Sequence, residues 1–387
     1  MRWLPAQEAR PRRRRRGRPG VGNAPGDPGR AARLTASVGR GGTATRDAST
    51  LDERDFPLLK TKGSQSTPAT RPEPEEPTWN MSSDVPMQEE FARRLAAIER
   101  VFDTRLLEGR GEGEAEIARY YEQSRWAYWL FHSNDGAMHM ALNPDGVFDK
   151  HGYFGQAREV ERLISPNTES VLELATGRGF NLRYLAERHP HTSFTGVDLV
   201  PQHISAARAK AKGLGNLRFL VGDFHRLPFD PGSFDTLFVV ESLCHATDLD
   251  RALHEAHRVL RPGGFFVVID GWRTANFAKL PEDAQRAVAA TEQAMSVGRP
   301  WVIGDWLDAV VGTGFEVVDD RDLTEQILPT VRRLERIARI ILSHPRMARA
   351  AQRVLPERFL MNAIAVYLMR LTVTTGAHTY RLVALRR

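Results

Sequence analysis

A turn containing two glycines follows an apolar run in the middle of the chain, and its residue types suit the binding of a nucleotide. Residues 171–179 read VLELATGRG. Small residues such as Ala175, Gly177 and Gly179 let the backbone approach a ligand closely, and the helix expected after them offers free N–H groups at its first turn. A nucleotide-type ligand is the usual occupant of such a turn in an open α/β sheet. Glycines also end strands for structural reasons, so the turn alone is a weak indication.

Two aspartates near the ends of later apolar runs strengthen this interpretation. Asp198 lies 19 residues beyond Gly179, and an acid there can accept hydrogen bonds from both ribose hydroxyls. Asp223 follows the next run, between Gly222 and Phe224. Its carboxylate could accept a hydrogen bond from an adenine amino group while the Phe224 ring lies against the base. Three such sites at three successive strand ends would share one edge of a sheet.

The elements needed to position these residues alternate between strands and helices. Apolar runs predict strands at 170–175, 193–197, 217–221, 236–240 and 265–269, with helices near 181–188, 201–212 and 248–260. Such alternation predicts a parallel sheet with helices on both faces. Later patterns predict a helix at 306–311, strands at 315–318 and 380–385, and a helical insertion over about 324–374 between those strands.

Residues 171–270 resemble the catalytic core of the class I S-adenosylmethionine-dependent methyltransferases. The sequence FDPGSFD at 229–235 is similar to the family's lead into its fourth strand, and EAHRVLRPGG at 255–264 is similar to its helix and turn before the fifth. The resemblance implies an α/β fold with a Rossmann-like, doubly wound sheet of seven strands that ends in an antiparallel hairpin. It also implies S-adenosyl-L-methionine as methyl donor and S-adenosyl-L-homocysteine as product.

The same resemblance assigns the donor site residue by residue. It places Glu173 near the methionine amino group, Asp198 on the ribose and Asp223 on the adenine, with Leu199, Gly222 and Phe224 beside them. Two positions depart from the common pattern, because Glu173 stands where Asp is commoner and Ala175 where Gly is commoner. The rival interpretation is a nicotinamide enzyme. This sequence lacks the third glycine of the Gly-x-Gly-x-x-Gly fingerprint of such enzymes, and a nicotinamide cofactor would leave Asp223 unexplained.

Candidate catalytic residues lie after the fourth predicted strand and in two upstream segments. Glu241 and His245 follow the strand, His139 lies within GAMHMAL, and Tyr120 precedes Tyr121. These features resemble the branch of the family that methylates sterols, tocopherols and other prenyl-derived lipids, in which the aromatic pair and the histidine segment help to enclose donor and acceptor. Structural alternatives remain open. Glu241 and His245 could form an i, i+4 pair on a helix, His139 could be a satisfied loop histidine, and the tyrosines could be core residues.

The function expected from these residues is methyl transfer to a small hydrophobic acceptor, such as a terpenoid, sterol, quinone or polyketide-like molecule. An alkene acceptor would form a cation that aromatic faces or a carboxylate can stabilise; Trp272, Trp301 and Trp306 could add walls to its pocket. One alternative is an O- or N-methyltransferase of a polar metabolite, with His245 or Glu241 as base. The other is a non-catalytic regulatory module that binds the donor.

The insertion carries arginines among apolar positions. Ile337, Ile340, Ile341 and Leu342 alternate with seven arginines between 332 and 353. A basic amphipathic helix can rest on an anionic membrane surface, and it can equally cover a substrate pocket. Peripheral membrane contact through residues 331–358 is therefore one expectation. No window in the sequence approaches the length of apolar chain that a spanning helix needs.

Charge and composition divide the chain into three expected parts. Residues 1–50 contain 12 Arg and three acids, so this segment has a net charge of +9. The whole chain has a net charge of +6, so the remaining residues sum to −3. Because the excess charge lies on a tail, nucleic acid is not the expected partner of the folded part. We expect a basic tail without regular structure over 1–86, an N-terminal helical cap over 87–169, and a methyltransferase domain over 170–387. A transit peptide and a true start at Met81 or Met87 are alternatives for the tail.

Cysteine usage points to a reducing compartment. Cys244 is the one cysteine of the chain, so neither an intrachain disulfide nor a cysteine-rich metal site can form. We expect no metal, a cytoplasmic location with membrane association as an option, and a thiol that is packed rather than nucleophilic. The oligomeric state is not determined by the sequence.

Overall fold

The computed structural model describes residues 85–102, 133, 135–351 and 357–387. These residues all belong to the same structural unit. Tyr120 and Tyr121 of the predicted cap, and residues 1–84 of the expected tail, lie outside the described residues. Helix α1 (Val85–Glu99) includes the last two residues of that expected tail. Among the described helices, none combines the length and the apolar character that crossing a bilayer requires.

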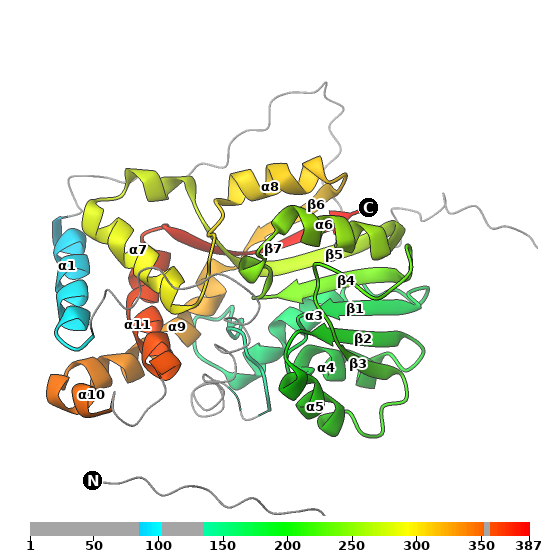
Figure 1. Cartoon of the computed structure of the whole chain (residues 1–387), viewed down its shortest axis with the longest axis horizontal. Coiled ribbons are helices and arrows are strands. Elements are labelled where there is room, and N and C mark those ends of the chain that lie inside the picture. Colours follow the sequence, from blue (N-terminus) through cyan, green and yellow to red (C-terminus); the bar gives the residue numbers. More distant parts are fainter. Residues whose placement is uncertain (1–84, 103–132, 134, 352–356) are drawn as a thin grey trace, which may run out of the picture. The chain divides into compact units, whose positions relative to one another are not determined.

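A sheet of seven strands forms the centre of this unit (Figure 1). Its order is β3-β2-β1-β4-β5-β7-β6. The first five strands are parallel, and β7 runs antiparallel to both of its neighbours. The predicted seven-stranded Rossmann-like sheet with a closing antiparallel hairpin is therefore confirmed. The strands are β1 (Ser170–Leu174), β2 (Ser193–Asp198), β3 (Leu217–Val221), β4 (Phe234–Val240), β5 (Leu260–Arg273), β6 (Glu316–Asp322) and β7 (His378–Arg386).

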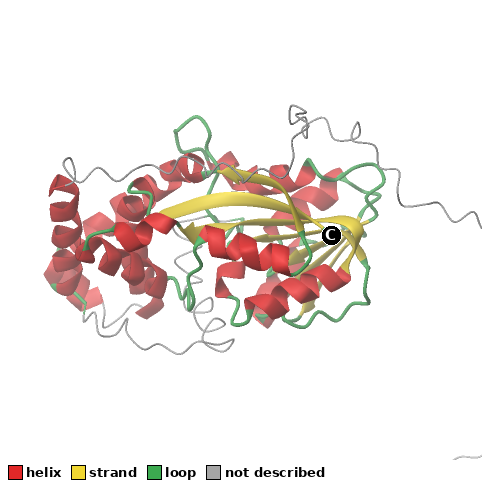
Figure 2. Ribbon diagram, turned by 90° about the horizontal axis from the view of Figure 1, so that it is seen from above, coloured by secondary structure: helices red, strands yellow, loops and turns green. Residues whose placement is uncertain are grey.

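Helices cover both faces of the sheet because successive strand residues point to opposite sides. On one face, Val171 and Phe238 pack with α3 (Gly155–Glu161), α4 (Phe180–Arg188) and α5 (Pro201–Lys210). On the other face, Leu172 and Leu237 pack with α6 (Leu249–Val259) and α8 (Ile303–Gly312). Figure 2 shows the two helical layers above and below the strands. Both faces of the central strands are buried, which explains their unbroken apolar sequence.

A second hydrophobic core lies among helices beyond the carboxyl ends of the parallel strands (Figure 1). The predicted insertion consists of α9 (Thr324–Leu342), α10 (Pro345–Ala351) and α11 (Glu357–Thr374). Two further helices join it, α7 (Glu282–Ala294) and α1 (Val85–Glu99). Helix α7 was missed in the sequence, where its alanines give little apolar contrast between its two sides.

Helix α1 does not share a core with the other described part of the predicted cap. It packs on α7 and α11, whereas α3 packs on α4. Arg94 of α1 is fully buried and forms an ion pair of 2.6 Å with Glu335 of α9. Helix α1, which precedes the sheet in sequence, therefore packs with the helices of the insertion. Short helical turns complete the described chain: η4 (Lys150–Phe154), η5 (Leu243–His245) and η6 (Ala275–Lys279).

Candidate active site

A cleft of about 920 Å³ lies at the carboxyl ends of β1, β2 and β3. Strands β1 and β4 are neighbours in space but not consecutive in sequence, and such a switch point is where open α/β sheets bind ligands. Eight of the nine residues predicted for the donor site line this cleft: Glu173, Ala175, Gly177, Asp198, Leu199, Gly222, Asp223 and Phe224.

The loop after β1 turns sharply toward β2. Ala175 has φ +50° and Gly177 has φ +54°, so both occupy the left-handed region that favours glycine. The N–H of Gly177 donates to Oδ2 of Asp198 at 2.8 Å. This bond joins the predicted nucleotide-binding turn to Asp198, the acid predicted to bind the ribose, and fixes both at one edge of the sheet.

Gly179 is the ninth predicted residue, and it does not line the cleft. It is the N-cap of α4, with φ +70°. A Cβ added there would lie 2.4 Å from Cζ of Phe219. The close packing of α4 against β3 and the positive φ together account for a glycine at this position, and ligand contact by Gly179 stays a prediction.

Asp198 and Asp223 are each oriented by a histidine. Oδ1 of Asp198 accepts the N–H of Val200 at 2.8 Å and lies 3.2 Å from Nδ1 of His203. Oδ1 of Asp223 accepts the N–H of His225 at 2.8 Å and lies 2.7 Å from that histidine's Nδ1. Because Nε2 of His225 accepts the N–H of Asp248 at 3.4 Å, its Nδ1 carries the proton and donates to Asp223.

Glu173 lines the cleft and is buried. Burial raises the pKa of its carboxyl to about 8, although hydrogen bonds from Thr176 and from Asn181 at 3.0 Å act in the opposite direction. Within the described ranges no basic side chain pairs with it. A ligand with an ammonium group would supply the missing positive charge, and two further acids suit a ribose and an adenine. The residues present therefore fit S-adenosylmethionine.

A second pocket of about 1130 Å³ adjoins the cleft. Met138, Glu241 and His245 line both. The wall of the second pocket is largely apolar: Trp272, Trp301 and Trp306 lie on one side, and Ile327, Met369 and Val373 of the insertion on another. The insertion therefore covers a pocket, which was one of the two interpretations of its sequence, and the three tryptophans do form part of the wall.

Glu241 directly follows β4, with φ +47°. Its Oε1 accepts the N–H of Met140 at 2.7 Å and the hydroxyl of Tyr380 at 2.8 Å. Burial raises the pKa of this carboxyl to about 7. A left-handed residue followed by the short turn η5 cannot form an i, i+4 pair on an α-helix, so the helix-pair alternative for Glu241 and His245 is wrong.

The two candidate histidines have assigned tautomers. Nδ1 of His245 donates to the carbonyl of Ser296 at 3.0 Å, and Nδ1 of His139 donates to the carbonyl of Met140 at 3.1 Å. Burial lowers the pKa of both imidazoles. Each is therefore neutral at pH 7, with its basic lone pair on Nε2. His245 lies at the junction of cleft and pocket, whereas His139 lines only the cleft and packs edge-on against Phe180.

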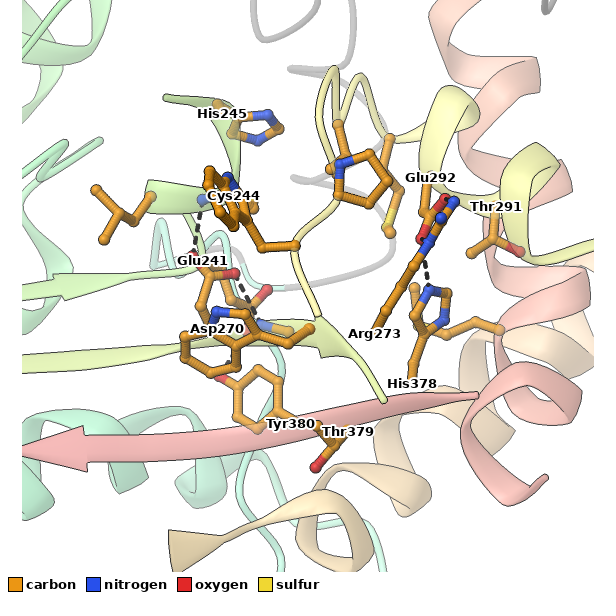
Figure 3. A pocket seen from close by; sticks show the side chains of 18 of the residues that line it. Glu241, Cys244, His245, Asp270, Arg273, Thr291, Glu292, His378, Thr379 and Tyr380 are labelled. Atoms are coloured by element: carbon orange, nitrogen blue, oxygen red, sulfur yellow. Dashed lines mark hydrogen bonds and ion pairs between the residues drawn. The ribbon is translucent and has the colours of Figure 1, made fainter. Parts of the chain in front are cut away.

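Several pocket residues were not singled out in the sequence. Asp270 lies near the carboxyl end of β5, is buried, and accepts the N–H of Cys244 at 3.1 Å. Burial raises the pKa of Asp270 to about 6 and raises the pKa of the Cys244 thiol. Figure 3 shows Asp270 beside Glu241 and Tyr380. Asp270, like Asp198, follows an apolar run that predicts a strand, so its position in the sequence could have identified it. Tyr380 gives no such signal because it enters from antiparallel β7.

Comparisons with known proteins agree with this architecture. Residues 172–268 match the family described as "Methyltransferase domain". Demethylmenaquinone methyltransferase of Thermus thermophilus is 37% identical over 114 residues, 29% of this chain and 52% of that protein, so the match spans about half of that relative. The S-adenosyl-L-methionine-dependent Diels-Alderase iccD of Talaromyces variabilis is 30% identical over 236 residues, 56% of this chain and 78% of that protein.

A solved structure extends the likeness of fold. The [4+2]-cyclase SpnF superposes with a TM-score of 0.58 at 19% identity, over 72% of this chain and 97% of that one. The strand order, the lining of the cleft and the sequence relatives all indicate the same family. The chain belongs to the class I S-adenosylmethionine-dependent methyltransferase family.

Proposed function

We propose that the chain binds S-adenosylmethionine in the cleft and transfers its methyl group to a small hydrophobic acceptor in the adjoining pocket. The observation that carries the proposal is the junction of the two cavities at Met138, Glu241 and His245. A donor with its nucleoside on Asp198 and Asp223 and its amino group at Glu173 would present the methyl group of its sulfonium, which lies between these two parts, toward that junction. Terpenoids, quinones, sterols and polyketide-like molecules match the largely apolar wall.

The donor supplies an activated methyl group, so alignment and exclusion of water can account for much of the rate. Glu241 and His245 stand where an acceptor hydroxyl or amine would lose its proton. For an alkene acceptor, Glu241 and Asp270 would instead face the positive charge that develops, with Trp272 beside it. Tyr120 and Tyr121 remain predicted contributors to the enclosure.

Binding of the donor is tested by calorimetry with S-adenosylmethionine and S-adenosylhomocysteine, in which we expect saturable binding of both. Absence of a heat of binding at millimolar ligand would contradict the proposal. The acceptor is sought by incubating a cell extract with labelled donor and identifying the labelled product by mass spectrometry. Fragment masses then separate carbon from oxygen or nitrogen methylation, and a polar labelled product would favour the polar-metabolite alternative.

A cycloaddition is the second candidate, because the relative aligned over 78% of its own length is named a Diels-Alderase. In that case the donor would act as a bound structural ligand, and the apolar pocket would fold a polyene chain onto itself. The two candidates differ in one measurement. Methyl transfer releases one S-adenosylhomocysteine per product, whereas cycloaddition releases none.

The insertion is proposed to be the cover of the acceptor pocket. Its residues Ile327, Met369 and Val373 point inward to the pocket wall, whereas Arg332, Arg336 and Ile340 are exposed on α9. Peripheral contact of this outer face with an anionic membrane stays a separate prediction. Sedimentation with vesicles containing phosphatidylserine tests it, and binding that is equal to neutral vesicles would contradict it. The reducing, cytoplasmic location is likewise still a prediction.

A further inference from the structure

The acceptor pocket has a second polar group of residues, at a distance from Glu241 and Asp270. Arg273 ends β5, His378 begins β7, and Glu292 comes from α7; all three line the pocket. Arg273 and His378 are direct partners across the antiparallel pair. In Figure 3 this group lies apart from the group formed by Glu241, Asp270 and Tyr380. The pocket is thus apolar along its length and polar at two separate places.

Glu292 is saturated by its neighbours. Its carboxylate accepts Nε of Arg273 at 2.6 Å on Oε1 and Nη2 of the same guanidinium on Oε2. Nε2 of His378 lies 3.0 Å from Oε1. The side chain of Glu292 is 5% exposed, and its pKa is lowered by these hydrogen bonds although burial opposes them. An ionised, fully bonded carboxylate offers little to a ligand.

Arg273 keeps donors that Glu292 does not use. A guanidinium has five N–H donors, and the fork of Arg273 gives only its Nε and Nη2 edge to Glu292. No hydrogen bond within the described part of the chain uses its Nη1 group, and the guanidinium lies over the ring of Phe277, with Cζ 3.9 Å from the ring centroid. Arg273 is one of the residues that line the pocket. Arg299 also lines the pocket, stacked over Trp301 at 4.7 Å, and no carboxylate of the described chain pairs with it. This end therefore carries a surplus of donors and of positive charge.

The opposite end has the reverse character. Asp270 is buried and Glu241 is half-buried, and neither acid has a basic partner in the described part of the chain. Arg273 lies three positions after Asp270 on β5, so their Cα atoms are about 10 Å apart in an extended strand. A purely hydrocarbon acceptor would leave the Arg273 donors without a partner, which costs binding free energy.

We propose that Arg273, positioned by Glu292 and His378, binds an anionic oxygen group of the acceptor, such as a carboxylate, at the end of the pocket away from Glu241. This inference rests on the proposed function, in which the pocket receives the acceptor. It narrows the substrate class from hydrophobic molecules in general to amphipathic ones that carry an acidic group at one end.

The test uses a matched pair of probes, 6-phenylhexanoate and 6-phenylhexan-1-ol, titrated into the full chain by calorimetry. The titrations are run with and without saturating S-adenosylhomocysteine, so the result on the probes stands whether or not the donor site behaves as proposed. We expect the carboxylate to bind about tenfold or more tightly than the alcohol. Equal affinities, or binding of neither probe, would overturn the inference.

Variants separate binding from a purely structural ion pair. Arg273→Gln and Arg273→Lys remove the fork and should abolish or sharply reduce the preference, the lysine variant retaining the charge without its geometry. Arg321→Gln is the matched control, because Arg321 is likewise held in ion pairs, with the carboxylates of Glu159 and Asp319, but lies outside the pocket. It should keep the full preference. His378→Gln provides a second route if Arg273 variants fold poorly, and a preference that survives both changes contradicts the proposal.

Discussion

The hydroxyl of Tyr380 donates a hydrogen bond of 2.8 Å to Oε1 of Glu241 across 139 positions of sequence. The same oxygen accepts the N–H of Met140 at 2.7 Å, and Tyr380 in turn accepts a bond of 3.1 Å from Gln156. The final antiparallel strand therefore orients the carboxyl that stands between the donor cleft and the acceptor pocket. This relationship makes Glu241 the residue whose chemistry is most directly testable.

Glu241→Gln should lower the rate of methyl transfer to an oxygen or nitrogen acceptor by about 100-fold or more, since general bases contribute on that order. The wild-type rate should rise with pH through about 7, where burial places the pKa of Glu241, because only the ionised carboxylate accepts a proton. In the glutamine variant this rise should disappear. Rates measured from pH 5.5 to 9 check the expectation.

Tyr380→Phe is the companion variant. The hydrogen bond from Tyr380 lowers the pKa of Glu241, because it stabilises the ionised form. Its removal should therefore move the rise in rate to higher pH while leaving donor affinity unchanged. A glutamine variant that kept the wild-type pH profile would exclude Glu241 as the base and direct attention to His245.

Asp198→Asn should weaken binding of S-adenosylhomocysteine by about tenfold to a hundredfold, as expected for losing hydrogen bonds to a charged group. Part of this loss comes from the loop, because the carboxylate of Asp198 accepts the N–H of Gly177 at 2.8 Å. Calorimetric titration measures the change. Asp308→Asn, at an exposed position of α8, is the control and should bind normally; a parallel loss there would mean that the effect is not specific to the cleft.

The sheet could be predicted from the sequence because its strands are apolar runs bounded by turn residues. The strand predicted at 217–221 coincides with β3 (Leu217–Val221), and the others differ at their ends. The largest difference is β5, which extends from Leu260 to Arg273. Residues 270–273 of this extension pair with β7, and a pairing partner more than a hundred positions away leaves no local pattern.

The donor cleft was more predictable than the acceptor pocket for a physical reason. Acids such as Asp198 and Asp223 follow consecutive parallel strands, so the topology alone brings them to one edge. The pocket instead collects residues from β5, α7, α11 and β7. Glu292, for example, lies in a helix with no strand before it to mark its place, and only tertiary packing brings it to Arg273.

Ala175→Gly should stabilise the loop after β1. Ala175 has φ +50°, a conformation that costs about 1–2 kcal/mol for a residue with a Cβ. Glycine removes this cost, but its greater conformational entropy also stabilises the unfolded chain by about 0.4–1 kcal/mol. We expect a net gain of about 0.5 kcal/mol in the free energy of unfolding, together with equal or tighter donor binding.

Urea unfolding and calorimetry measure the two effects of this change. Ala141→Gly is the control, because Ala141 is fully buried and has no positive φ to relieve. That variant should lose stability. If Ala175→Gly also lost stability, the left-handed conformation at this position would not be a source of strain.

Arg94→Met should destabilise the chain by about 3 kcal/mol, at the lower end of the range for breaking a buried ion pair. Arg94 is fully buried and bonds Glu90 at 2.7 Å and Glu335 at 2.6 Å. Glu335 retains Arg339 and Arg370 as partners, so its charge is not left isolated. The adjacent Arg93→Met is the matched control: its side chain is 58% exposed, and such a pair contributes less than about 1 kcal/mol. Urea denaturation of both variants at pH 7 measures the difference, and equal losses would show that α1 is not bound to the insertion through Arg94.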